Sequence, residues 1–252
     1  MSTEQGRPGL PEIDLHEYGG KKDGERQQMD RRLFMQLLVY DCPPGRDVEE
    51  PTAALIDGLE KAGLAGVVYE DANAPQGLAL LTWSEDPTHF VTNVRPLFRA
   101  EGVRGLIPRR ESTMIGRSYS NGHEPDLEDS LLHRFVRNVT HPEWRWGVWY
   151  PLRRNGEFAR LDRKEQATIL REHASIGMAY GRGDHAHDVR LACHGLDEND
   201  NEFVIGLVSA RLHRLSHLVQ RMRSTVQTSS YITQMGPFFV GHARWQSTGA
   251  DA

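Results

Sequence analysis

The stretch Trp144–Leu152, with the sequence WRWGVWYPL, predicts a β-strand and begins the run of elements that decides the fold. Aromatic residues and valine favour extended backbone. The elements expected after it are a helix at 162–180, strands at 188–194 and 202–208 around the turn-rich segment 195–201, a helix at 210–225 and a strand at 236–245 (GPFFVGHARW). The second half of the chain therefore has the order β-α-β-β-α-β.

The first half of the chain repeats this order. Its expected elements are a strand at 32–41 (RLFMQLLVYD), a helix at 49–62, strands at 66–71 and 77–83, a helix opened by Asp86-Pro87 that buries Phe90, Val91, Val94 and Leu97, and an extended segment at 111–118. A β-α-β-β-α-β unit is ferredoxin-like, with two helices on one face of an antiparallel sheet. We therefore predict an α+β protein of two tandem ferredoxin-like units, of the dimeric α+β barrel type.

The domain organisation follows from this repeat. Residues 1–30 are polar and predict a flexible N-terminal arm or an oligomer contact, and residues 31–118 form the N-terminal unit. Residues 119–143 predict a linker with a short helix, which carries His123, His133 and His141. Residues 144–246 form the C-terminal unit.

The bulk composition excludes several classes of protein. The chain has 252 residues, 38% of them hydrophobic, and a net charge of −5, which does not suggest general nucleic-acid binding. Its two cysteines form no disulfide framework and no metal-binding spacing. No apolar run approaches the length of a membrane span, and we expect a cytoplasmic protein.

His173 lies at the centre of the apolar stripe of the helix expected at 162–180. The residues one or two turns away on the same face are Ile169, Leu170, Ile176, Gly177 and Tyr180. Ala174 and Gly177 are small, so a flat group could approach the helix there. An imidazole on an apolar wall suits the axial ligation of an iron porphyrin. The alternative is a core histidine with one hydrogen bond.

Four segments together resemble the chlorite dismutase superfamily, which includes the coproheme decarboxylases. They are Trp149-Tyr150-Pro151-Leu152, the segment 171–177 (REHASIG), Gly195-Leu196-Asp197 and the segment 236–241 (GPFFVG), and the resemblance covers roughly residues 30–246. It implies tandem ferredoxin-like units, a ring-shaped homo-oligomer, usually a pentamer, and haem b or Fe-coproporphyrin III as cofactor. It also implies that His173 is the proximal iron ligand, with Phe158, Ile169, Ile176 and Gly177 near the cofactor.

The decarboxylase branch of that superfamily uses a tyrosine in a Tyr-Pro pair as a radical relay. Tyr150-Pro151 resembles this pair, and Tyr150 precedes His173 by 173 − 150 = 23 positions, as in one branch. The resemblance implies that Arg154 holds a propionate, for which a guanidinium is well suited, and that His133 is the candidate distal base. The alternatives are a strand tyrosine at a sheet edge and a solvated charge in the hairpin.

Arg190 lies on the strand that follows the His173 helix, where chlorite dismutases carry a distal arginine. Such a side chain over the open iron face would favour anions such as chlorite or assist cleavage of peroxide. The alternative is a surface arginine on an edge strand, and a slip of one residue would turn it to the other face of the sheet. A separate metal site at His185, His187, Cys193 and His194 is disfavoured, because the segment 181–188 (GRGDHAHD) predicts a polar turn.

The leading functional prediction is a haem-dependent oxidoreductase that converts coproheme to haem b by peroxide-dependent oxidative decarboxylation. In that case His173 anchors the iron, and Tyr150 abstracts hydrogen from a propionate held by Arg154. One alternative is a chlorite dismutase or peroxidase-like enzyme with Arg190 as the distal group. Another is a non-catalytic haem-binding or haem-sensing protein. The expected partners are therefore a porphyrin and either hydrogen peroxide or chlorite.

Overall fold

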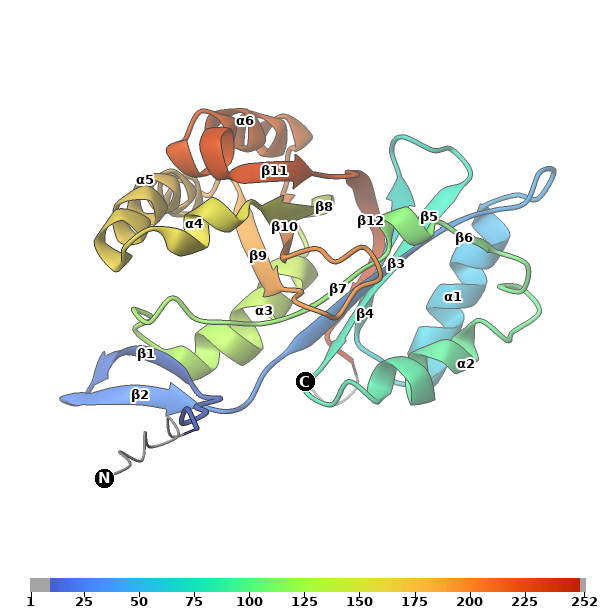
Figure 1. The fold of residues 1–252 in the computed structure, drawn as a ribbon. Helices are drawn as coiled ribbons and strands as arrows, with labels where there is room; N and C mark the ends of the chain where they lie inside the picture. Colours follow the sequence, from blue (N-terminus) through green and yellow to red (C-terminus); the bar gives the residue numbers. More distant parts are fainter. Residues whose placement is uncertain (1–9, 250–252) are drawn as a thin grey trace, which may run out of the picture.

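The computed structural model describes residues 10–249, which form two similar α+β halves (Figure 1). The first half contains β3 (Phe34–Asp41), α1 (Glu49–Lys61), β4 (Gly66–Asp71), β5 (Gly77–Ser84), a π-helical turn (Phe90–Val94) running into α2 (Arg95–Leu97), β6 (Ile107–Pro108) and β7 (Met114–Arg117). The second half contains β8 (Trp146–Arg154), α4 (Gly156–Arg160), α5 (Arg163–Arg182), β9 (His187–Ala192), β10 (Phe203–Ser209), α6 (Leu212–Arg223), β11 (Ile232–Met235) and β12 (Phe239–Ser247).

The sheets of the two halves close into one barrel. In the first half the strand order is β7-β3-β5-β4, and in the second it is β9-β10-β8-β12, which is the ferredoxin-like arrangement in both cases. Strand β4 pairs with β12, and β7 meets β9 at Arg117 and Ala192. The edge strands of each half thus pair with the edge strands of the other half. This closed barrel of two ferredoxin-like units confirms the predicted fold class.

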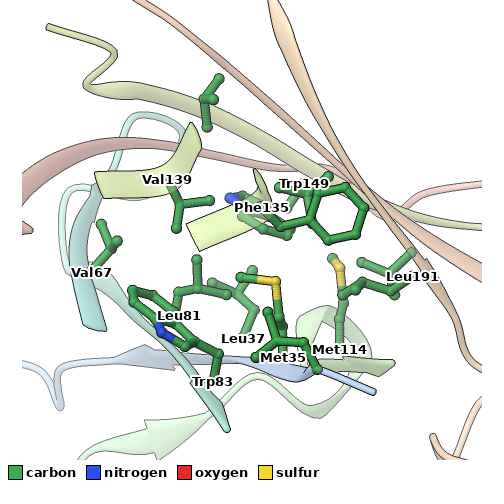
Figure 2. Packing of buried hydrophobic residues seen from close by; sticks show 14 of the residues in the cluster. Met35, Leu37, Val67, Leu81, Trp83, Met114, Phe135, Val139, Trp149 and Leu191 are labelled. Atoms are coloured by element: carbon green, nitrogen blue, oxygen red, sulfur yellow. The ribbon is translucent and has the colours of Figure 1, made fainter. Parts of the chain in front are cut away.

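The interior of the barrel holds the main hydrophobic core. Strand alternation turns Met35, Leu37, Leu81, Trp149 and Leu191 inward, where they pack together (Figure 2). A second contribution comes from the helix between the halves, a π-helical turn (Asp129–His133) that continues into α3 (Arg134–Thr140). Its buried residues Leu131, Leu132, Phe135 and Val139 belong to the same core. The segment predicted as a linker is therefore an integral part of the core.

The outer face of the barrel is covered by helices. On the first half, Leu55 and Leu59 of α1 pack over Val68, Leu78 and Leu80. On the second half, α5 and α6 lie over the sheet (Figure 1). There Leu215 and Leu218 of α6 pack against Val148, Tyr150 and Leu207. Along each of these strands, side chains that point into the barrel core thus alternate with side chains that face the helices.

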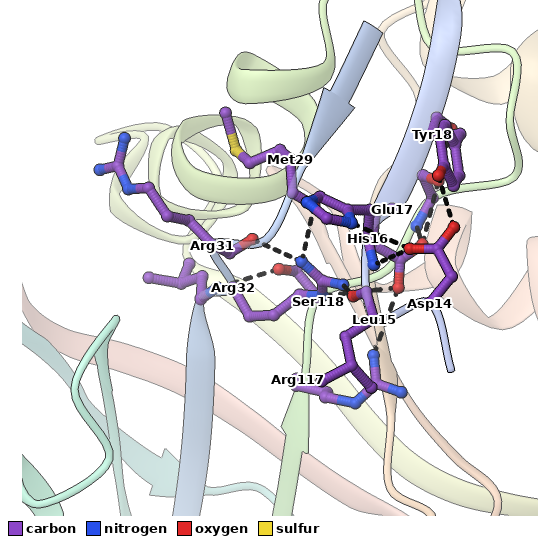
Figure 3. A network of polar contacts seen from close by, with 12 residues as sticks. Asp14, Leu15, His16, Glu17, Tyr18, Met29, Arg31, Arg32, Arg117 and Ser118 are labelled. Carbon is purple, nitrogen blue, oxygen red and sulfur yellow. Dashed lines mark hydrogen bonds and ion pairs between the residues drawn. The ribbon is translucent and has the colours of Figure 1, made fainter. Parts of the chain in front are cut away.

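The N-terminal segment, for which the sequence predicts a flexible arm or an oligomer contact, packs against the first half from residue 17 onward. Residues 17–29 form a hairpin of β1 (Glu17–Lys22) and β2 (Glu25–Met29). Glu17 accepts hydrogen bonds from the backbone N–H (2.9 Å) and the hydroxyl (3.0 Å) of Ser120, and it pairs with Arg32 at 3.5 Å. Arg32 also donates to the Leu15 carbonyl at 2.7 Å (Figure 3). These contacts tie the segment to the start of β3; the part of the predicted arm at 1–9 lies outside the described residues.

Two local expectations fail. Val91 is 49% exposed rather than buried, because the π-helical turn at Phe90–Val94 shifts the face that the helical periodicity assumed. Trp144 precedes β8 and stacks between the imidazoles of His141 (ring centroids 3.9 Å apart) and His187 (3.5 Å) instead of joining the strand. Within residues 10–249, no helix is long and apolar enough to cross a membrane.

Candidate functional site

Helix α5 begins at a strong N-terminal signal. The carboxylate of Asp162 accepts hydrogen bonds from the backbone N–H groups of Lys164 and Glu165, both at 2.8 Å. The Glu165 carboxylate in turn accepts from the Asp162 N–H at 3.1 Å. This capping box satisfies backbone donors that the first helical turn leaves free. The start of the helix, and with it the phase that places His173, is thereby fixed.

Helices α1 and α5 occupy equivalent places in the two ferredoxin-like halves but pack differently. Helix α1 fully buries Pro51, Thr52, Leu55 and Leu59. None of the twenty residues of α5 is fully buried, although Ile169, His173 and Ile176 form a half-buried stripe on it. An amphipathic helix normally buries its apolar stripe. The loosely covered stripe of α5 is therefore where this half differs from its counterpart.

His173 is half-buried on that stripe and is tied to the end of α6. Its Nδ1 lies 3.1 Å from the Thr225 hydroxyl. Burial lowers the pKa of His173, and the positive charge of Arg190 lowers it further. The imidazole is therefore neutral at neutral pH, which is the state that binds metals.

The outer face of the C-terminal sheet presents one row of side chains toward the helices. Tyr150 on β8 and Arg190 on β9 are both register partners of Ile205 on β10. Directly paired residues in antiparallel strands point to the same face. The flanking residues Val189 and Leu191 belong to the barrel core, so Arg190 faces outward, on the side of α5.

The surroundings of Arg190 are polar. Its Nε lies 2.8 Å from Asp188 Oδ2, in an ion pair that lacks the alignment of a hydrogen bond. Burial opposes the charge of the guanidinium, but the carboxylates of Asp188 and Glu124 favour it, and on balance the pKa of Arg190 is raised. The Arg190 side chain is 31% exposed, and its positive charge is one of the causes that lower the pKa of His173.

Tyr150 lies in the apolar layer beneath α6. It is 4% exposed, and its ring stacks on Phe238 with centroids 4.6 Å apart. Burial raises the pKa of Tyr150, and the charge of Arg223 opposes that shift only in part. The phenol therefore keeps its proton at neutral pH.

Arg154 is committed to a carboxylate of the protein itself. Its Nε donates to Glu202 Oε1 at 3.0 Å and to Oε2 at 3.1 Å, and its Nη2 also donates to Oε1. The guanidinium carbon lies 4.4 Å from the ring centre of Phe158 and 4.7 Å from that of Phe203. Phe158, which is 5% exposed, therefore packs against Arg154. A propionate at Arg154 would have to compete with Glu202.

The remaining predicted site residues lie in different environments. His133 is exposed on the π-helical turn before α3. Gly177 faces α6, because a Cβ there would lie 3.6 Å from Met222 Cε. His187 Nε2 pairs with Asp184 at 2.8 Å. In the part of the chain that is described, no three or more His, Cys, Asp or Glu side chains group to hold a metal ion.

Three residues of the site were missed by the sequence analysis. Thr225 contacts His173 from 52 positions away, and Glu202 meets Arg154 from 48 positions away. Asp188 reaches Arg190 by strand alternation, which places i and i+2 on one face. The last could have been found from the strand pattern alone, whereas the first two depend on tertiary contacts.

Comparison with known proteins relates this chain to the chlorite dismutase family. Residues 124–244 match the chlorite dismutase family. No curated protein sequence matches the chain. Three solved structures are similar: a candidate chlorite dismutase (14% identity, TM-score 0.69, 84% of this chain and 95% of that chain covered), a haem-binding protein from Thermus thermophilus (20%, 0.65, 84% and 91%), and the imidazole complex of chlorite dismutase from Candidatus Nitrospira defluvii (13%, 0.65, 84% and 90%). At these identities the solved structures establish the shared fold, while the family match covers the half that carries His173.

Proposed function

We propose that this chain, a member of the chlorite dismutase superfamily through residues 124–244, binds an iron porphyrin between α5 and the outer face of β8, β9 and β10. His173 would ligate the iron through Nε2, because its Nδ1 is engaged by Thr225. The half-buried residues Ile169 and Ile176 on α5 and Ile205 on β10 would supply apolar walls. These residues fit a porphyrin, which needs one basic nitrogen and flat apolar surfaces.

The observation that carries this proposal is the difference between α1 and α5. Two equivalent helices of one repeated fold differ in that α1 buries four residues and α5 none. The less covered helix is the one that carries a neutral histidine at the centre of its stripe. A purely structural histidine would give no reason for α5 to pack less closely than α1.

The proposed reaction is oxidative decarboxylation of Fe-coproporphyrin III to haem b. For each propionate, R–CH2–CH2–COO⁻ + H2O2 + H⁺ gives R–CH=CH2 + CO2 + 2 H2O. The bound iron supplies the centre at which peroxide is reduced. Tyr150 would first lose its phenolic hydrogen atom with peroxide as the oxidant, and the resulting phenoxyl would take a hydrogen atom from the propionate β-carbon, which restores the phenol; its buried position would shield this residue from solvent. Arg190 would hold positive charge on the sheet side of the bound porphyrin. Because Arg154 pairs with Glu202, it would orient this end of β8 and would meet a propionate only through its remaining nitrogen, Nη1.

A second candidate is the conversion of chlorite, and the placement of Arg190 favours it. An anionic substrate gains from a preorganised cation in a partly buried site. Arg190 faces α5 from the sheet, and its charge acts on His173. In this case Tyr150 would be a packing residue under α6 rather than a reactant.

The test is to add Fe-coproporphyrin III and hydrogen peroxide to the purified protein and to follow the porphyrin by mass spectrometry. Loss of two carboxyl groups supports the decarboxylase, whereas oxygen release from chlorite with the porphyrin unchanged supports the second candidate. His173→Ala should abolish or strongly shift the Soret band of the bound porphyrin. His213→Ala, which removes an exposed imidazole of α6, is the matched control. An unchanged spectrum and affinity in His173→Ala would exclude the proposed ligation.

A further inference from the structure

We infer that Thr225 is a positioning residue that holds His173 in the tautomer protonated at Nδ1 and thereby keeps the Nε2 lone pair free. The inference about the tautomer concerns the protein alone. Its consequence for a bound iron rests on the proposed function.

The hydroxyl of Thr225 has three polar neighbours besides His173. It lies 2.8 Å from the Met222 carbonyl oxygen, 3.2 Å from the Thr228 hydroxyl and 3.4 Å from the Thr228 backbone nitrogen. The distance to His173 Nδ1 is 3.1 Å. A hydroxyl has one proton to donate and two lone pairs with which to accept.

The count of protons decides the direction of the contact with His173. The Met222 carbonyl has no proton, so its short contact is a hydrogen bond only if Thr225 donates. Once that proton is committed, Thr225 can only accept from its other neighbours. Nδ1 of His173 must then carry the proton, and Nε2 of the neutral imidazole is left with its lone pair.

The surrounding backbone holds the Thr225 hydroxyl in place. Thr225 is 1% exposed, so no bulk water competes for it. Its backbone N–H donates to the Met222 carbonyl at 3.1 Å, and its carbonyl accepts from the backbone N–H of Ser229 at 2.9 Å. A second link between α5 and this turn runs beside the first, because the Glu172 carboxylate accepts from the Val226 N–H at 3.0 Å. Two adjacent residues of α5, Glu172 and His173, thus contact two adjacent residues of the turn after α6, Val226 and Thr225.

A neutral hydroxyl partner also sets the electronic character of the histidine. The group that binds the second ring nitrogen of a metal-ligating histidine fixes the ring and tunes the basicity of the ligand. A carboxylate would draw the Nδ1 proton toward itself and make the ring a stronger electron donor. The Thr225 hydroxyl leaves the ring a neutral imidazole, so a bound iron would be easier to reduce than with a carboxylate partner.

The first experiment uses the protein without porphyrin and measures the ¹⁵N chemical shifts of the His173 ring. The native chain should show a protonated Nδ1 and an unprotonated Nε2. Thr225→Val keeps the shape but removes the acceptor, so the Nε2-protonated form should become populated, and Thr225→Ser should restore the native pattern. Thr168→Val is the matched control, because Thr168 on α5 also donates to a helix carbonyl but does not contact His173. A protonated Nε2 in the native chain, or an unchanged pattern in Thr225→Val, would overturn the inference.

The second experiment measures the reduction potential of the bound iron. Thr225→Asp should shift the midpoint potential to more negative values, while Thr225→Ser should stay near the native value. Circular dichroism of each variant identifies any that fail to fold. If Thr225→Asp does not fold, the potential of Thr225→Ser can still be compared with that of the native chain. An equal potential in the native chain and Thr225→Asp would contradict the electronic role. If no porphyrin binds, the proposed function fails, but the ring shifts still decide the tautomer.

Discussion

Tyr150 and Arg190 face the same side of the barrel, because each is the direct register partner of Ile205 on the strand between them. They are two strand spacings apart, about 10 Å. That distance is comparable to the width of a flat macrocycle lying on the row. Under the proposed function, the porphyrin would have to reach from Arg190 beside α5 to Tyr150 beneath α6, and variants of these two residues separate the two enzymatic candidates.

Tyr150→Phe should bind Fe-coproporphyrin III as the parent does but form no decarboxylated product. The change removes only the hydroxyl, so the stacking on Phe238 and the packing under α6 remain. Mass spectrometry of the porphyrin after peroxide addition provides the measurement. Normal product formation by this variant would remove Tyr150 from the reaction.

Arg190→Ala should reduce the turnover of chlorite or peroxide by about 10²–10³, because one preorganised donor in an active site contributes that much. Porphyrin affinity should change little, since His173 supplies the iron ligand. Arg190→Lys keeps the charge but loses the planar fork, and it should retain part of the activity. A variant within about twofold of the parent would indicate an exposed charge of little energetic weight.

The fold was largely predictable from the sequence because it depends on local periodicity. The strand at 66–71 has the predicted ends, and the helix expected at 162–180 runs from Arg163 to Arg182. The closure of the barrel through β4 and β12 joins segments far apart in the chain, and the sequence indicated it only through the repeat of the ferredoxin-like order. The burial of Leu131 and Phe135 in a segment predicted as a linker depends on tertiary packing that no local pattern reports.

The candidate site was predictable only where it follows from a single element. His173 could be found because the helical period places it on the stripe. Which way Arg190 faces depends on register, which the sequence left open by one residue. The partners of Arg154 and His173 could not be found, since Glu202 and Thr225 come from other elements and meet them only after folding.

Gly206→Ala should destabilise the protein by about 1–3 kcal/mol through overpacking. Gly206 is the register partner of Trp149, and a Cβ on Gly206 would lie 2.5 Å from the indole carbon Cζ3. Trp149 is 1% exposed and cannot move aside without disturbing the barrel core. Gly181→Ala is the control, because a Cβ there meets no heavy atom within 4 Å, and it should be neutral or slightly stabilising in a helix. Thermal or urea unfolding measures both variants, and equal stabilities would contradict the close approach.

Glu202→Gln should remove part of the pH dependence of stability in acid. Burial disfavours the Glu202 carboxylate, but the hydrogen bonds and charge of Arg154 outweigh it and lower its pKa below the ordinary 4.5. A carboxyl whose pKa is lower in the folded state stabilises fully above its unfolded pKa, and this contribution is lost as the pH falls through the folded value. The parent should therefore exceed Glu202→Gln by about 1.5–3 kcal/mol at pH 7, the usual contribution of hydrogen bonds to a charged group. The two should converge below the folded pKa, where both side chains are neutral. Urea unfolding between pH 3 and pH 7 provides the measurement.

Asp129→Asn, which breaks the more exposed pair with Arg137, should give a smaller effect. A constant gap between parent and Glu202→Gln at every pH would show that Arg154 does not hold the carboxylate in its charged form.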